Sequence, residues 1–356
     1  MINRRSAKEV YVGSVKVGGN APISVQSMTN TDTRDVADTV KQIKELESAG
    51  CEIIRVAVPD HTAVNSLQPI LDQISIPLIA DIHFNYQLAL EALEKGVHGL
   101  RINPGNIGGE EKVAAVVAAA GKENVPIRIG VNAGSLEKEL LQIYGGITAE
   151  AMVESALRHV RILERLQYNN VKISLKASNV PLMADAYRIL AHKVDYPLHV
   201  GVTEAGTLRA GTVKSAVGIG ILLAEGIGDT IRVSLTGHPI HEVQVGYDIL
   251  KTLGLRKKGI ELISCPTCGR TEIDLIPIAE EVEDKLKGID LPLQVAVMGC
   301  VVNGPGEARH ADIGIAGGKG EGLLFKKGKI IRKIAGDKLA DELVSEVYAI
   351  YNQMKK

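Results

Sequence analysis

Short apolar, β-branched runs alternate along the chain with segments of helical periodicity. The segment before the second run places Val40, Ile43 and Leu46 on one stripe and ends at Gly50, as an amphipathic helix does. Repeated strand–helix units indicate a parallel sheet, and eight of them over about 250 residues predict a TIM (β/α)8 barrel. The predicted strands are 23–28, 53–58, 77–83, 99–104, 126–132, 171–177, 197–204 and 230–235.

One phase of these strands is polar. Successive side chains of a strand point to opposite faces, and one phase is apolar, as in Ile54, Val56 and Val58. We expect this apolar phase to face the helices and the other to face the lumen, which most barrels fill with Val, Ile and Leu. The residues of interest in the lumen phase are Arg55, Asp81, His83, Arg101, Asn103, Arg128, Asn132, Lys176, Arg232 and Ser234.

Cations gathered in such a lumen predict an anionic ligand. Arginines in a region of low dielectric are costly unless negative charge compensates them. Because guanidinium groups bind phosphate oxygens in a bidentate manner, four arginines and Lys176 can hold a diphosphate or two linked phosphates. The alternative is an internal network in which the arginines pair with Asp81, Glu204 and other carboxylates.

The ends of the strands supply candidates for catalysis. TIM-barrel active sites lie at the C-terminal ends of the strands, under the loops that follow them. Glu204, in GVTEAG, is the leading candidate for an acid or proton donor. Asp81 and His83, in ADIHF, are further candidates for acid–base work or for contacts to hydroxyl groups.

The strand–helix rhythm breaks near residue 258. We expect a barrel over 1–257 and a small α+β domain over 258–356. This second domain carries three of the four cysteines, and the pattern Cys265-x2-Cys268, Cys300-x6-Glu307 indicates a soft-metal site. Zinc held by the cysteines with Glu307 or His310 is the alternative, but one Cys-x2-Cys pair favours an iron–sulfur cluster over a paired-knuckle zinc site.

Composition excludes several classes of protein. A formal net charge of −1 with no Trp and two Phe argues against a nucleic-acid-binding protein. The apolar run at 217–224 is too short to cross a membrane. Few cysteines and a polar start without an apolar leader predict a cytoplasmic protein with reduced thiols.

Several longer motifs carry a family resemblance that covers nearly the whole chain. The chain resembles the 4-hydroxy-3-methylbut-2-enyl diphosphate synthases, in their short bacterial form without a domain inserted between barrel and cluster module. The motifs are VQSMTNTDT, IRVAVP, IADIHF, GLRINPGNIG, IRIGVNAGSLE, HVGVTEAG, CPTCGR and VMGCVVNGPGEARHADIGIAGG.

The resemblance implies a reaction and roles for residues. The family opens 2-C-methyl-D-erythritol 2,4-cyclodiphosphate and removes a hydroxyl in a two-electron reduction, on the methylerythritol phosphate route to isoprenoids. Electrons arrive from reduced ferredoxin or flavodoxin through a four-iron, four-sulfur (4Fe-4S) cluster. The implied cluster ligands are Cys265, Cys268, Cys300 and Glu307. Because an oxygen ligand binds iron less tightly than a thiolate does, we expect Glu307 to be the removable ligand. The implied diphosphate-binding residues are Arg55, Arg101, Asn103, Arg128, Asn132, Lys176, Arg232 and Ser234, with Glu204 as the acid beside Asp81 and His83.

The resemblance also implies a homodimer in which the cluster domain of one chain caps the barrel of the other. The order of the elements favours the same arrangement. A helix after the eighth strand returns toward the N-terminal face of a barrel, so a module attached there is far from its own active-site mouth. We therefore expect the partner subunit's cluster domain to face the lumen.

Overall fold

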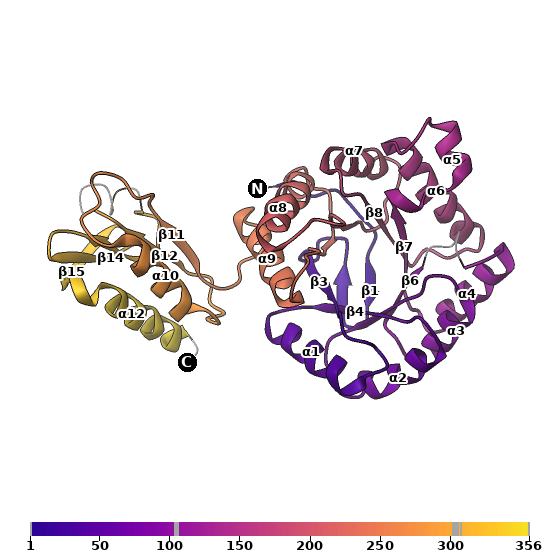
Figure 1. The fold of residues 1–356 in the computed structure, drawn as a ribbon, viewed down its shortest axis with the longest axis horizontal. Helices are drawn as coiled ribbons and strands as arrows, with labels where there is room; N and C mark the ends of the chain where they lie inside the picture. The colour runs from indigo at the N-terminus through magenta and orange to yellow at the C-terminus, as the bar shows by residue number, and fades with distance from the viewer. Residues whose placement is uncertain (1, 103–106, 301–305, 307, 355–356) are drawn as a thin grey trace. The chain divides into compact units, whose positions relative to one another are not determined.

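The computed structural model describes residues 2–102, 107–300, 306 and 308–354. The chain divides into two compact units, Met1–Arg256 and Lys257–Lys356 (Figure 1). Among the sequence-predicted site residues, Asn103 and Glu307 lie outside the described residues.

The first unit is a TIM barrel, as predicted. Its parallel strands follow the order β8-β7-β6-β5-β4-β3-β10-β9. A single parallel bridge from Ile173 to Leu198 joins the two ends of this order, so the sheet closes on itself. The strands are β3 (Ser24–Met28), β4 (Ile53–Ala57), β5 (Leu78–Asp81), β6 (Gly99–Ile102), β7 (Ile127–Asn132), β8 (Val171–Lys176), β9 (His199–Val200) and β10 (Thr230–Ile231).

Helices surround the strands (Figure 1). Several begin at a side chain that accepts a hydrogen bond from a backbone N–H of the first turn, as Asp35, Asp60 and Thr148 do. The segment after β7 forms two helices, α5 and α6, with Gly145 and Gly146 between them. The helices are α1 (Val36–Ser48), α2 (His61–Leu71), α3 (Tyr86–Glu94), α4 (Glu110–Lys122), α5 (Lys138–Ile143), α6 (Ala149–Arg165), α7 (Val180–Ala191), α8 (Leu208–Ala224) and α9 (Pro239–Thr252).

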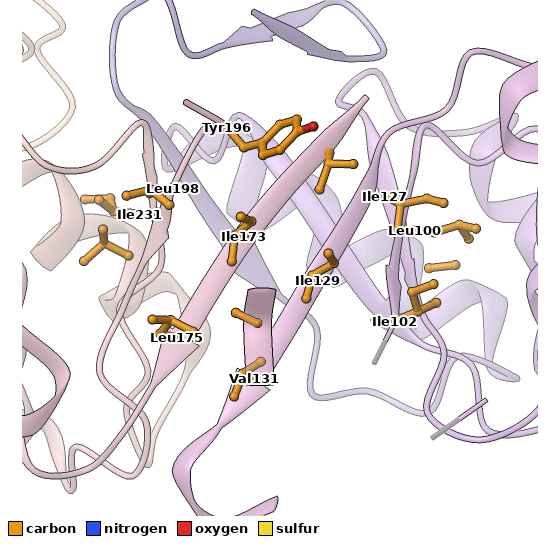
Figure 2. Packing of buried hydrophobic residues seen from close by; sticks show 14 of the residues in the cluster. Leu100, Ile102, Ile127, Ile129, Val131, Ile173, Leu175, Tyr196, Leu198 and Ile231 are labelled. Carbon is orange, nitrogen blue, oxygen red and sulfur yellow. The ribbon is translucent and has the colours of Figure 1, made fainter. Parts of the chain in front are cut away.

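The apolar phase of the strands packs against the helices, as predicted. Figure 2 shows this core, where Ile127, Ile129 and Val131 of β7 lie beside Ile173 and Leu175 of β8. All five side chains are buried. Because strand side chains alternate, the buried cations of the other phase must point into the lumen.

Two features differ from the expectation. The last two barrel strands are much shorter than predicted, since β9 ends at Val200 and β10 ends at Ile231, although the Arg232 N–H still donates to the Val200 carbonyl at 3.0 Å. A Cβ at Gly201 would lie 2.4 Å from the Arg232 carbonyl oxygen. An unpredicted hairpin, β1 (Val10–Val12) and β2 (Val15–Val17), precedes the barrel, and its Val12 and Val17 form one apolar cluster with Ile53 and Ile79 of the lumen phase.

The second unit holds a five-stranded sheet in the order β11-β12-β13-β14-β15. Strands β11 to β13 are parallel, and β14 and β15 form an antiparallel hairpin. Helices α10 and α12 supply apolar side chains to one core with Val295 and Val297. The elements are β11 (Glu261–Ser264), α10 (Leu275–Leu286), β12 (Gln294–Met298), β13 (Ile313–Gly317), β14 (Glu321–Lys326), β15 (Lys329–Ala335) and α12 (Leu339–Met354).

Candidate active site

A row of charged side chains crosses four neighbouring strands of the barrel. The register pairs Asp81 of β5 with Arg101 of β6, Arg101 with Arg128 of β7, and Arg128 with Lys172 of β8. All four side chains are buried, and Arg128 is only 1% exposed. The lumen of this barrel is therefore polar, as the alternation predicts.

Asp81 joins three of the predicted site residues. Its carboxylate lies 3.5 Å from Arg55 Nε, 3.2 Å from Arg101 Nη1 and 3.5 Å from His83 Nε2. Burial favours the neutral acid, but Arg55, His83 and Arg101 outweigh it and hold the pKa of Asp81 well below its usual range. The internal network that we considered is thus present for Arg55 and Arg101.

Arg128 and Lys176 have no such compensation. Among the described residues no carboxylate lies within ion-pair distance of either, and Arg128 Nε and Nη1 have no hydrogen-bond partner there. Burial first, and then neighbouring arginines, lower the pKa of both side chains well below the usual values. Buried donors without acceptors are costly, so this part of the lumen fits an anion.

The remaining predicted binding residues line the end of the same lumen. Arg232 is partly buried, and its Nη2 lies 3.5 Å from Glu242 Oε2 of α9. Ser234 follows it and is partly exposed. Asn132 ends β7 in register with Lys176. The structure therefore places Asn132, Lys176 and Arg232 on three strand ends of one barrel.

The candidate acids differ in exposure. Glu204 lies on the loop after β9, exposed, with a left-handed backbone φ of 50°. Such a conformation is uncommon for a residue other than glycine and occurs often at functional loops. Its side chain joins no ion pair among the described residues, so it takes no part in the internal network. His83 also reaches solvent, since its side chain is 53% exposed.

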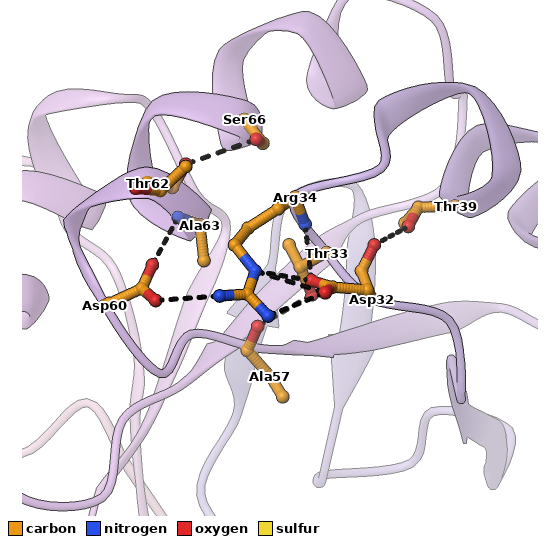
Figure 3. A network of polar contacts seen from close by, with 9 residues as sticks. All are labelled: Asp32, Thr33, Arg34, Thr39, Ala57, Asp60, Thr62, Ala63 and Ser66. Atoms are coloured by element: carbon orange, nitrogen blue, oxygen red, sulfur yellow. Dashed lines mark hydrogen bonds and ion pairs between the residues drawn. The ribbon is translucent and has the colours of Figure 1, made fainter.

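A polar network fixes part of the barrel rim (Figure 3). Arg34, on the loop after β3, donates from Nε and Nη2 to the carboxylate of Asp32 at 2.9 and 2.7 Å. Its Nη1 donates to Asp60, the N-cap of α2, at 3.2 Å. The hydroxyl of Thr33 donates to the Ala57 carbonyl at the end of β4. Arg34 thereby connects two adjacent βα loops.

Sequence reasoning missed two polar groups at the site, Lys172 and Glu242, and placed a third, His199, in the lumen without giving it a role. Lys172 lies four residues before Lys176 in the same phase, so the alternation alone could have found it. Burial and Arg128 lower the pKa of Lys172 to about 7. His199, fully buried with no partner on either ring nitrogen among the described residues, belongs to the same phase. Glu242 gave no signal, because it lies on a helix.

The three predicted cysteine ligands occupy the second unit. Cys265 follows β11 and Cys300 follows β12, two parallel neighbours, and the Gly299 N–H donates to Cys265 Sγ at 3.2 Å. Cys268 is exposed, and hydrogen bonds from the backbone and side chain of Arg270 lower its thiol pKa. The fourth cysteine, Cys51, is buried in the barrel.

The chemistry of the three cysteines suits an iron–sulfur cluster. Three free thiols, one of them already biased toward thiolate and one accepting a backbone N–H, match the chemistry of iron–sulfur ligation. Within the part of the chain that the structure describes, no group of three or more His, Cys, Asp or Glu residues is gathered closely enough to hold a metal ion.

A TIM barrel whose lumen is lined with buried cations, joined to a cysteine-bearing α/β domain, defines a two-domain barrel enzyme. The GcpE TIM-barrel domain matches residues 7–247, and the GcpE protein C-terminal domain matches residues 261–349. The chain belongs to the GcpE family and is an enzyme, an oxidoreductase.

Relatives cover almost the whole chain. A protein of Geobacter sulfurreducens is 65% identical over 347 residues, covering 98% of each chain. A protein of Caldanaerobacter subterraneus is 62% identical, covering 97% of each. Both are named 4-hydroxy-3-methylbut-2-en-1-yl diphosphate synthase (flavodoxin).

Solved structures with less than 25% identity share the barrel fold. The 3-dehydroquinate dehydratase of Geobacillus kaustophilus has a TM-score of 0.50 at 14% identity, covering 69% of this chain and 98% of its own. None of the helices in the described part of the chain combines the length and apolar character needed to cross a membrane.

Proposed function

We propose that this enzyme converts 2-C-methyl-D-erythritol 2,4-cyclodiphosphate into 4-hydroxy-3-methylbut-2-enyl diphosphate. The observation that carries the proposal is the pair Arg128 and Lys176, buried in the lumen with no carboxylate beside them among the described residues. A diphosphate is the ligand chemistry that compensates them. The names of the relatives supply the product.

The lumen residues bind and orient the substrate. Arg128 and Lys176 contact the phosphate oxygens, with Arg55, Arg101, Arg232, Asn132 and Ser234 around them, and Asn103 as a further contact. Asp81 fixes the guanidinium groups of Arg55 and Arg101, so that their donors are already in place when the substrate arrives. Fixed donors also stabilise the negative charge that develops as the ring C–O bond opens.

Glu204 delivers the proton of the reaction. Two electrons enter the carbon skeleton, the ring C–O bond breaks, and the hydroxyl leaves as water once it has gained a proton. An exposed carboxyl at a strand end, with His83 and Asp81 as further hydroxyl contacts, suits this step. The Glu204→Gln variant should keep its fold and its affinity for the substrate while kcat falls about 10²- to 10⁴-fold. An unchanged kcat would remove Glu204 from the mechanism.

Cys265, Cys268, Cys300 and Glu307 would hold the 4Fe-4S cluster. When bound, such a cluster supplies electrons one at a time at low potential. The electron carrier proposed for this cluster is a flavodoxin, which the names of the relatives include, or a ferredoxin. Glu307, the single oxygen ligand, is the weakest of the four.

A homodimer completes the site. The last residue of the barrel unit, Arg256, donates to the carbonyl of Ile23, which precedes β3, at 2.8 Å. The barrel unit therefore ends at the N-terminal face, opposite the mouth where TIM-barrel chemistry occurs. We place the cluster domain of the partner subunit at that mouth. A catalytically competent monomer in solution would contradict this part of the proposal.

Anaerobic purification tests the proposal as a whole. We expect a brown protein with broad absorption near 400 nm and about four irons per chain, which converts the cyclodiphosphate when a reductant is supplied. A colourless protein containing zinc would support a non-redox barrel enzyme with a structural zinc module instead. A protein that contains iron but does not convert the cyclodiphosphate would support the proposed cluster and contradict the proposed substrate.

A further inference from the structure

A second group of cations lies on the hairpin of β14 and β15, away from the barrel. The segment from Lys326 to Lys333 holds five cations and no carboxylate. Arg332 pairs with Glu342 and Glu346 of α12, and Lys333 pairs with Glu321. The three exposed cations that join no ion pair among the described residues are Lys326, Lys327 and Lys329.

Exposed apolar side chains adjoin these lysines. Ile330 and Ile331 are 58% and 56% exposed, on a strand at the edge of the sheet. The register pairs Ile330 with Phe325. Phe325 belongs to an apolar cluster separate from the one that α10 and α12 join, so Ile330 lies on the face of the sheet away from these acid-rich helices. By the same alternation Lys326 and its register partner Lys329 lie on the opposite face, so these lysines and Ile330 share the tip and edge of the hairpin and not one face of the sheet. We call Lys326, Lys327, Lys329, Ile330 and Ile331 the hairpin patch.

The hairpin patch is connected to the cysteine-bearing segments. The cluster that contains Phe325 also contains Ala308 and Ala311, and Cys265 packs against it. The Lys327 N–H donates to the Ala311 carbonyl at 3.2 Å. At Gly328, a Cβ would lie 3.1 Å from Arg309 Cβ, so the turn touches a residue two positions after Glu307 in the sequence.

We propose that the hairpin patch is the docking surface for an acidic one-electron carrier protein of the flavodoxin kind. This inference rests on the proposed function, because it names where the electrons of that reaction enter. Exposed cations at the tip of a hairpin, next to exposed apolar side chains on its edge strand, suit a transient electron-transfer encounter, which charge steers and a small apolar contact completes. Each encounter oxidises the carrier by one electron and reduces the enzyme by one, so two encounters supply one turnover.

The experiment reverses the charge of the patch in the cluster-loaded enzyme. The patch variant carries Lys326→Glu, Lys327→Glu and Lys329→Glu. The control variant carries Lys41→Glu, Lys122→Glu and Lys138→Glu, three exposed lysines of the barrel unit. Turnover is measured with reduced flavodoxin and with reduced methyl viologen, a small cation that needs no basic docking surface. Binding of oxidised flavodoxin is measured by calorimetry between low and high salt.

We expect the patch variant to lose at least tenfold in kcat/KM for flavodoxin, to lose most of its salt dependence, and to bind oxidised flavodoxin at least tenfold more weakly. Turnover with methyl viologen should not change, and the control variant should behave like the wild type. Unchanged kcat/KM and unchanged flavodoxin binding in the patch variant would overturn the inference. Aggregation as the sole effect would overturn it too, because the lysines would then only protect the edge strand from pairing with another chain. Displacement of flavodoxin by a short RNA at equal concentration would also overturn it.

The two proposals fail separately. If the wild-type enzyme does not convert the cyclodiphosphate with methyl viologen, the proposed function fails. The calorimetric measurement still decides the docking surface, because it needs no turnover.

Discussion

The barrel and the C-terminal unit use positive charge in opposite ways. In the lumen, Arg128 and Lys176 are buried, and no carboxylate of the described residues lies within ion-pair distance of either side chain. On the hairpin patch, Lys326, Lys327 and Lys329 stand in solvent. A buried cation gains much from a ligand that replaces its lost hydration, whereas an exposed cation attracts a partner from a distance and contributes little once bound. Under the two proposals, burial separates the cations that hold a small anion from the cations that guide a protein.

Removing a proposed cysteine ligand should have the largest effect on activity. It should abolish the function of the C-terminal unit and leave that of the barrel unchanged. In a Cys300→Ala variant we expect turnover and bound iron to be lost. The barrel does not depend on that ligand, so its affinity for inorganic pyrophosphate should equal that of the wild type. Iron analysis and calorimetry with pyrophosphate check both halves, and a barrel that loses pyrophosphate binding would contradict this independence.

Replacing Arg128, the most buried arginine, should weaken anion binding and stabilise the fold. Arg128→Met removes donors from the lumen, so affinity for pyrophosphate should fall about 10²- to 10³-fold. The same change removes an uncompensated buried charge, so the free energy of unfolding without ligand should rise by about 1–4 kcal/mol. Calorimetry and urea unfolding measure the two effects, with Arg165→Met, an exposed arginine of α6, as control. A variant that is less stable without ligand would refute the argument.

The pH dependence of the free energy of unfolding should reflect the lowered pKa of Lys172. Its pKa is lowered to about 7 in the folded protein from a usual value near 10.5, by burial first and Arg128 second. The unfolded chain therefore binds more protons between these values, and stability without ligand should rise as pH rises from 7 toward 10. The full difference is on the order of 5 kcal/mol. In urea unfolding, Lys172→Met should flatten this slope, whereas Lys122→Met should not.

The rim network should show the smallest effect. Arg34→Gln breaks exposed ion pairs to Asp32 and Asp60, which stabilise a fold by about 1 kcal/mol or less. Thermal unfolding should hardly change. Because the two βα loops are then no longer joined, KM for the cyclodiphosphate should rise several-fold at constant affinity for pyrophosphate. Arg34→Lys should restore only part of the effect, since lysine cannot bind Asp32 in a bidentate manner. An unchanged KM would make the network purely structural.

The barrel strands that are buried on both faces could be predicted from the sequence, whereas the full extent of β9 and the exposed strand β15 could not. The first six barrel strands combine an apolar phase with a regular register, and the alternation located Arg101 and Arg128 correctly in the lumen. The early end of β9 at Val200 could not be predicted, because the apolar phase of the sequence continues through Val202. Strand β15 has an almost fully exposed basic sequence, which carries no period-two signal.

The candidate site was predictable to a similar extent. The alternation predicted the charged lumen but not how its charges divide, because pairing depends on distances across the barrel. Asp81 satisfies Arg55 and Arg101, while Arg128 remains uncompensated among the described residues. The spacing of Cys265, Cys268 and Cys300 predicts a metal site by its chemistry alone, and that site is still a prediction. Glu307 and Asn103 stay predictions.

The N-terminal hairpin limits how an inhibitor of this enzyme can be built. Val12 and Val17 are fully buried against Ile53 and Ile79, so the lumen has an apolar floor below its cations. A compound anchored by a diphosphate mimic among the arginines cannot be extended past that floor. An inhibitor bound in the lumen can therefore be extended in one direction, outward past Glu204 to the rim formed by Arg34 and its partners.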